Sequence, residues 1–203
     1  GIYGGCTNGE NITINGGTVT AAGGDCGAGI GGGSGSSGSG GGGYGSGKDI
    51  TINGGTVIAA GGQKGAGIGG GCEGNGEDIT ITGGTVTAKG GEFGAGIGGG
   101  RDGSGETITI NDGTVTAAGT DGGAGIGGGE SGSGSNVTVS GAAQVTVTAS
   151  KSSAWVSADT GATIGNGGSV TEDGDLVGGK EIQADINGVT TGYIHHIIYN
   201  QDG

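Results

Sequence analysis

The 203-residue chain contains no proline, and its 64 glycines follow no Gly-X-Y period. A collagen triple helix needs that period together with abundant proline, so this glycine content does not indicate one. Disorder is the other usual interpretation of such a composition. It does not fit either, because the apolar residues recur at fixed intervals along the chain.

Basic residues are also scarce. Six Lys and Arg stand against 19 acidic residues, which gives a net charge of −13 at pH 7. Nucleic acids and anionic membrane surfaces bind basic faces, so we expect neither as a partner. No window approaches the apolar length of a membrane span. The acidic balance instead favours a surrounding layer of cations or a bound divalent metal.

The sequence repeats with a period of 29 residues. Ile-Thr-Ile triplets begin at residues 12, 50, 79 and 108, and Val-Thr-Val follows at 137. The first interval is 38 residues long, and we assign its nine extra residues to an inserted loop in the Ser/Gly-rich stretch 34–47. Each unit holds three short segments of alternating apolar and polar residues between glycine turns. This pattern predicts three β-strands per unit.

Stacked units would align equivalent apolar positions in columns. No unit can bury its apolar face alone, whereas each coil of a stack covers the coil below. The segment GAGIG is then a third strand that turns only Ala and Ile inward, with glycine where backbones pack closely. The expected inward columns begin at Ile12, Ile14, Val19, Ala28 and Ile30 and recur in each later unit.

The motif ITIxGGTVTA followed by GAGIGGG resembles the glycine-rich parallel β-helix repeats of bacterial secreted and cell-surface proteins, including relatives of pectate-lyase-like carbohydrate-binding proteins. The resemblance covers residues 1–168 and implies an all-β, right-handed parallel β-helix of about six coils. Residues 1–10 read as the end of a preceding coil, so we expect a fragment of a longer protein. Residues 169–203 leave the pattern and form a cap or the start of a further β domain. The stretch EIQADINGVTTGYIHHIIYN within them predicts a hairpin with an Asn-Gly turn.

The family that it resembles includes adhesins, polysaccharide binders and lyases, and we expect a non-enzymatic extracellular or cell-surface module, a rigid stalk or adhesin-like domain that contacts glycans or host-surface molecules. Aromatic side chains can stack on sugar rings, which makes Tyr44, Phe93 and Trp155 the candidate ligand-binding residues. Each is equally suited to packing on a neighbouring loop. A polysaccharide lyase is the enzymatic alternative, and it needs clustered carboxylates and a base. The outward positions repeat Thr, Gly and acidic residues, and Arg101 reads as a solvated loop charge, so we expect no catalytic residue.

Acidic residues precede most of the Ile-Thr-Ile strands, so stacking predicts ladders of carboxylates. Like charges one coil apart repel, and calcium would offset them through oxygen ligands from the ladder and the loops. The alternative is a solvated ladder in which Lys48 lies between Glu10 and Glu77. No other cofactor is expected. The candidate calcium ligands are Asp49, Glu77, Asp78 and Glu106.

The three cysteines predict free thiols. Cys6 and Cys72 occupy equivalent places two coils apart, roughly 9 to 10 Å at the usual strand spacing, which is too far for a disulfide. We place Cys26 in the opposite turn. Unpaired thiols suit a reducing or anaerobic habitat better than an oxidised secreted scaffold.

The outward face of the second strand indicates an alternative function. If the valine column points inward, its neighbours point outward and form two rows of threonine. Such rows resemble the ice-binding faces of β-solenoid antifreeze proteins, although threonine is also an ordinary β-branched residue of exposed strands. Ile58 interrupts one row. The rows consist of Thr18, Thr20, Thr56, Thr85, Thr87, Thr114 and Thr116.

Overall fold

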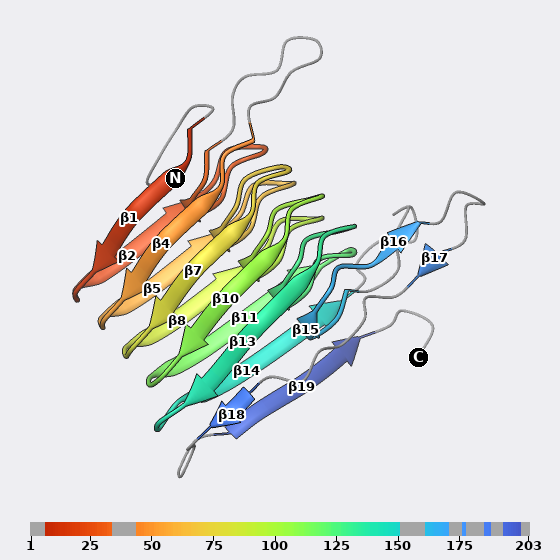
Figure 1. Ribbon diagram of the computed structural model, residues 1–203. Helices are drawn as coiled ribbons and strands as arrows, with labels where there is room; N and C mark the ends of the chain where they lie inside the picture. Colours follow the sequence, from red (N-terminus) through yellow and green to blue (C-terminus); the bar gives the residue numbers. More distant parts are fainter. Residues whose placement is uncertain are drawn as a thin grey trace.

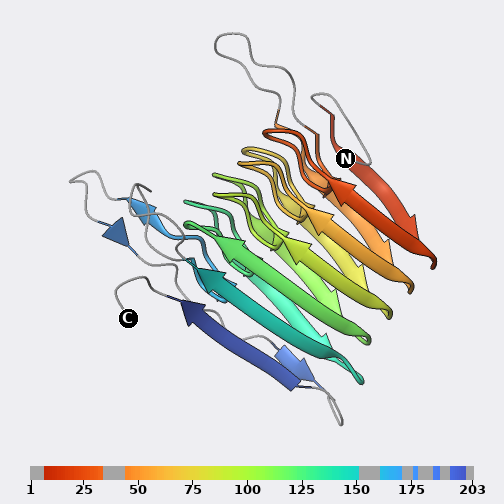
Figure 2. The same ribbon diagram turned by 180° about the vertical axis from the view of Figure 1, so that it is seen from behind.

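The computed structural model describes residues 7–33, 44–150, 161–170, 176–177, 185–187 and 193–199, and within these ranges it contains only strands, turns and bends. Equivalent strands of successive coils lie side by side and run parallel to one another (Figure 1). Figure 2, the view from behind, shows the same stack from its other broad face. The protein is therefore a parallel β-solenoid, as the 29-residue repeat predicts.

Three sheets run along the solenoid. The first sheet consists of β1 (Gly9–Ile14), β4 (Gly47–Ile52), β7 (Gly76–Ile81), β10 (Gly105–Ile110), β13 (Gly134–Ser140) and β18 (Asp185–Asn187). The second sheet consists of β2 (Thr18–Ala22), β5 (Thr56–Ala60), β8 (Thr85–Lys89), β11 (Thr114–Thr120), β14 (Gln144–Ser150) and β19 (Tyr193–Tyr199). The third sheet consists of the two-residue strands β3 (Ile30–Gly31), β6 (Ile68–Gly69), β9 (Ile97–Gly98), β12 (Ile126–Gly127) and β15 (Ile164–Gly165). A separate antiparallel pair is formed by β16 (Ser169–Val170) and β17 (Leu176–Val177).

The coil count differs from the expected six. About four regular turns are present, β1–β3, β4–β6, β7–β9 and β10–β12. The strands β13 to β15 repeat the order with a first strand one residue longer, and β18 and β19 extend only the first and second sheets. The expected count included residues 1–10 as the end of a preceding coil, and residues 1–6 lie outside the described part of the chain.

The hairpin expected near the C-terminus is wrong. The strands β18 and β19 belong to different sheets, and each pairs in parallel with the preceding coil, Val139 with Ile186 and Val145 with Ile194. The order Ile186-Asn187 repeats Ile52-Asn53, where the chain leaves the first sheet for the second. Both strands cover the last complete coil (Figure 1). The domain boundary at residue 168 stays a prediction.

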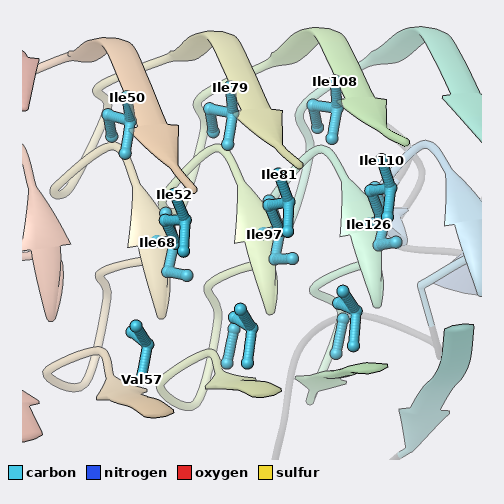
Figure 3. Packing of buried hydrophobic residues seen from close by; sticks show 14 of the residues in the cluster. Ile50, Ile52, Val57, Ile68, Ile79, Ile81, Ile97, Ile108, Ile110 and Ile126 are labelled. Carbon is cyan, nitrogen blue, oxygen red and sulfur yellow. The ribbon is translucent and has the colours of Figure 1, made fainter. Parts of the chain in front are cut away.

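The core consists of the predicted columns. Figure 3 shows Ile50, Ile79 and Ile108 at the same place in consecutive coils, and all three are completely buried. One inward column escaped the sequence analysis, because its residues are mostly small and sit at the end of the second strand. That column consists of Ala21, Ala59, Ala88, Ala117 and Val147.

The insertion after the first coil leaves the register intact. Across the 38-residue interval Ile12 pairs with Ile50, Thr18 with Thr56 and Ile30 with Ile68. Most of the inserted stretch lies outside the described residues. The strands on either side of it stack as those of the uninterrupted coils do.

Glycine in the third sheet is required by contact between backbones. A Cβ added to Gly98 would lie 2.0 Å from the carbonyl oxygen of Gly127 in the next coil, and Gly98 has φ +133°. Gly69 and Gly127 meet their own neighbours in the same way. A side chain at these positions would both strain the backbone and push consecutive coils apart.

This packing predicts a large difference between two glycine substitutions. We expect Gly98→Ala to lower the free energy of unfolding by about 2–5 kcal/mol, because it combines steric overlap with an unfavourable φ. Gly54→Ala is the matched control, since a Cβ at Gly54 would meet only Asn15 O at 3.7 Å. We expect it to change stability by less than about 1 kcal/mol. Urea denaturation measures both, and equal small losses would show that the third sheet is not closely packed.

Candidate functional site

Two glycine-rich turns of each coil meet along one edge of the solenoid, which we call the turn edge. It comprises the turns between the second and third sheets (residues 23–27, 61–65, 90–94 and 121–123) and those between the third and first sheets (residues 70–75, 99–104 and 128–133). Each turn between the third and first sheets donates a backbone hydrogen bond to the turn between the second and third sheets of the preceding coil. The donor and acceptor pairs are Cys72 N to Cys26 O at 2.7 Å, Arg101 N to Lys64 O at 2.8 Å and Glu130 N to Phe93 O at 2.8 Å.

The third strand explains why these turns meet. It is only two residues long, and the chain folds back around it, so that Ala66 N donates to Gly70 O at 2.9 Å. The turn that enters the strand and the turn that leaves it are therefore brought together. The expectation that Cys26 and Cys72 lie in opposite turns is wrong for this reason. Both are half-buried free thiols at the turn edge, while Cys6 lies outside the described residues.

Arg101 is not the solvated charge that the sequence suggested. Its Nε lies 2.7 Å from Glu130 Oε2 and 3.6 Å from Asp102 Oδ2, and its guanidinium stands 5.3 Å from the centre of the Phe93 ring. The Glu130 residue is only 3% exposed. Burial raises the pKa of Glu130, and the Arg101 charge opposes that rise. The 29-residue spacing between positions 101 and 130 was the available signal, since it places them in adjacent coils.

The three candidate aromatic residues lie in different surroundings. The Phe93 ring packs beneath Arg101, in line with the packing alternative. Tyr44 is 60% exposed, and the nearby Glu73 carboxylate raises the pKa of its hydroxyl. Trp155 lies outside the described residues. Ligand binding by any of the three stays a prediction.

An open groove of about 410 Å³ lies where the second sheet reaches the turn edge. Polar side chains from consecutive coils converge on it: Gln63 Nε2 donates to Glu92 Oε2 at 2.6 Å, and Thr120 Oγ1 donates to Gly91 O at 2.7 Å. Sequence reasoning missed this groove because its polar residues are spread over three coils. The lining consists of Ala60, Gly61, Gln63, Lys89, Gly90, Gly91, Glu92, Thr120 and Asp121.

The charged ladder of the first sheet has the register of the solvated alternative. Lys48 pairs between Glu10 and Glu77, and its Nζ lies 3.7 Å from Glu77 and 3.8 Å from Asp78. Glu106 continues the same row beside Glu77. Among the residues that the structure describes, no group of three or more His, Cys, Asp or Glu gathers as metal ligands would. Calcium binding therefore stays a prediction.

Backbone geometry explains which residue types directly follow the ladder positions in the sequence. These residues are passed over in the strand pairing and adopt left-handed φ values of 51° to 55°. Asn and Asp tolerate this conformation better than other non-glycine residues, so their presence does not require a metal. The column consists of Asn11, Asp49, Asp78, Thr107 and Asn136.

The second sheet presents the two threonine rows to solvent. One row pairs in consecutive strands as Thr18, Thr56, Thr85 and Thr114, and the other as Thr20, Ile58, Thr87 and Thr116. Every one of these side chains is exposed, Ile58 to 45%. The rows therefore form a regular array on one face of the solenoid.

Comparison with known proteins bears on the fold. A family model described as Beta helix repeat matches residues 12–34, 50–72, 79–101 and 108–130. Each match begins at the first Ile of an Ile-Thr-Ile triplet and ends beyond the third strand, so it covers most of one coil of the structure. Neither a curated protein nor a solved structure matches the chain. In the described part of the chain, no helix is long and apolar enough to cross a membrane.

Proposed function

Because the chain is a parallel β-helix repeat protein, we propose that it is a rigid, non-enzymatic module of an extracellular or cell-surface protein and that it binds a carbohydrate. The groove beside the turn edge is the observation that carries this proposal. Its lining residues come from three consecutive coils, so a ligand longer than one coil can contact it. Tyr44 and Trp155 remain candidates for additional contacts.

Rigidity comes from the backbone hydrogen bonds between coils. The three sheets join each coil to the next, and the turn edge adds further bonds such as Gly91 N to Gly65 O at 3.0 Å. Side chains on the surface are therefore held at fixed spacings from coil to coil. A preorganised array of this kind loses little conformational entropy when it binds an extended ligand.

The groove chemistry favours a neutral glycan. Its volume of about 410 Å³ lies within the common range of roughly 300–1,000 Å³ for small-ligand sites. The Gln63 amide offers both donors and acceptors, and the Glu92 carboxylate accepts hydrogen bonds, a combination that suits paired sugar hydroxyls. The net charge of −13 disfavours acidic polysaccharides.

A glycan array with point variants tests this proposal. We expect the wild-type protein to retain at least one neutral glycan, and Gln63→Ala or Glu92→Ala to weaken that binding about tenfold through the loss of one hydrogen-bonded contact. The control is Asn53→Ala, which removes an exposed amide that is hydrogen-bonded to Asn15 just beyond the ends of the first-sheet strands, outside the groove. No retained glycan, or the same loss in the Asn53 variant, would contradict the proposal.

Ice binding is a second candidate, favoured by the threonine array. Neighbouring strands lie about 4.8 Å apart and alternate residues about 6.7 Å apart, so the exposed threonines form a lattice of methyl and hydroxyl groups. The register continues through the insertion, where Thr18 pairs with Thr56. Such a lattice would order water over an extended flat area. Ile58 supplies a methyl-bearing side chain without a hydroxyl at one point of it.

Thermal hysteresis and ice-crystal shaping test this second candidate. We expect a measurable freezing-point gap at millimolar protein, and we expect Thr87→Tyr to abolish it because a large ring in the middle of the array breaks the lattice. Thr13→Tyr is the matched control, since Thr13 is an exposed threonine of the first sheet. Absence of hysteresis in the wild type, or an equal loss in both variants, would exclude ice binding.

A further inference from the structure

We propose that Cys26 and Cys72 form a disulfide under oxidising conditions and that this bond fastens the first coil to the second at the turn edge. The two residues come from consecutive coils, and the backbone hydrogen bond between them measures 2.7 Å. The site is a covalent modification site whose reactant is a small disulfide such as oxidised glutathione. It is independent of the glycan groove and of the threonine array.

The backbone places the pair within reach of a disulfide. Since Cys72 N contacts Cys26 O directly, the two Cα atoms are at most about 6.6 Å apart, and disulfides span up to about 6.8 Å. The two thiols are close enough for Cys26 to contribute to the raised pKa of Cys72. Both residues are half-buried, so a small oxidant can reach them. The bond can therefore form without separating the coils.

The surrounding charges indicate the order of the steps. The groups that face Cys72 are Cys26, Lys64, Glu73 and Tyr44. Burial, followed by the charge of Cys26, raises the pKa of Cys72 to about 11, while Lys64 lowers it. Few Cys72 side chains are therefore thiolates near neutral pH, which makes Cys72 a slow initial nucleophile, and we assign the first attack to Cys26.

The exchange proceeds in two balanced steps. The Cys26 thiolate attacks one sulfur of oxidised glutathione, forms a mixed disulfide and releases one glutathione thiolate. Cys26 then carries no charge, so its repulsion of the Cys72 thiolate disappears. The Cys72 thiolate attacks the Cys26 sulfur and releases the second glutathione. Two protein thiols are oxidised, and one glutathione disulfide is reduced to two thiols.

The position of the pair gives the bond a structural role. In the next two coil steps the same contact joins Lys64 to Arg101 and Phe93 to Glu130, without a covalent bond. Between the first and second coils, the disulfide would close a loop from residue 26 to residue 72 that contains the insertion. In the described part of the chain, Ile12 of the first coil is 7% exposed, whereas Ile50 of the second coil is fully buried. A bond here opposes loss of the first coil.

Oxidation of the folded protein by glutathione disulfide tests the proposal, with Cys6→Ser as the background that removes the third cysteine. We expect both remaining thiols to disappear, two glutathiones to be released, and a peptide cross-linked between residues 26 and 72 to be found by mass spectrometry. The melting temperature should rise by about 5–10 °C and fall back with dithiothreitol. Adding Cys72→Ser to this background should abolish the cross-link and the shift.

The same oxidation in denaturant shows whether the folded structure directs the pairing. We expect the 26–72 cross-link to form at least tenfold more slowly there, because the coils no longer hold the thiols together. The proposal is overturned if the folded Cys6→Ser protein keeps both thiols reactive or carries one glutathione on each. It is equally overturned if the cross-link forms as fast in the unfolded chain.

Discussion

Close contact between glycine backbones in the third sheet is the constraint on which the remaining structure depends. A carbonyl oxygen of each coil occupies the place where a Cβ of the preceding coil would stand, as between Gly98 and Gly127. Glycine loses much backbone entropy on folding, so this arrangement is costly for an isolated coil. Stacking offsets that cost, because each coil buries its isoleucine columns and hydrogen-bonds to two neighbours.

The same constraint limits where side chains that could bind a partner can lie on the surface. The third sheet exposes little beyond glycine, so side chains that can bind a partner are confined to the turn edge and to the outward faces of the first and second sheets. At the turn edge the fold-back around the short strand sets pairs of residues from consecutive coils against each other. The contact of Arg101 with Glu130 and Phe93, and the approach of Cys26 to Cys72, both follow from this geometry.

The regular part of the fold was readable from the sequence because two periods combine in it. Alternation within a strand identifies which residues point inward, and the 29-residue interval identifies which residues stack, so the columns of Ile50 and Val57 could be assigned correctly. The path of the glycine segments could not be read, because glycine has no side chain whose pattern reveals direction. This is why the adjacency of Cys26 and Cys72 was missed. The C-terminal strands β18 and β19 were misread because they lack the glycine triplets of the regular coils.

Amide hydrogen exchange of the third strands is the most direct measurement of the central claim. The amides of Gly96 and Ile97 donate to Ala124 and Gly125 in the next coil at 3.0 and 3.1 Å. If the glycine segments are locked between coils, these amides should exchange within about tenfold of the rates of Ile79 and Ile81 in β7. Exchange at the rate of an unfolded chain, with β7 still protected, would contradict the account.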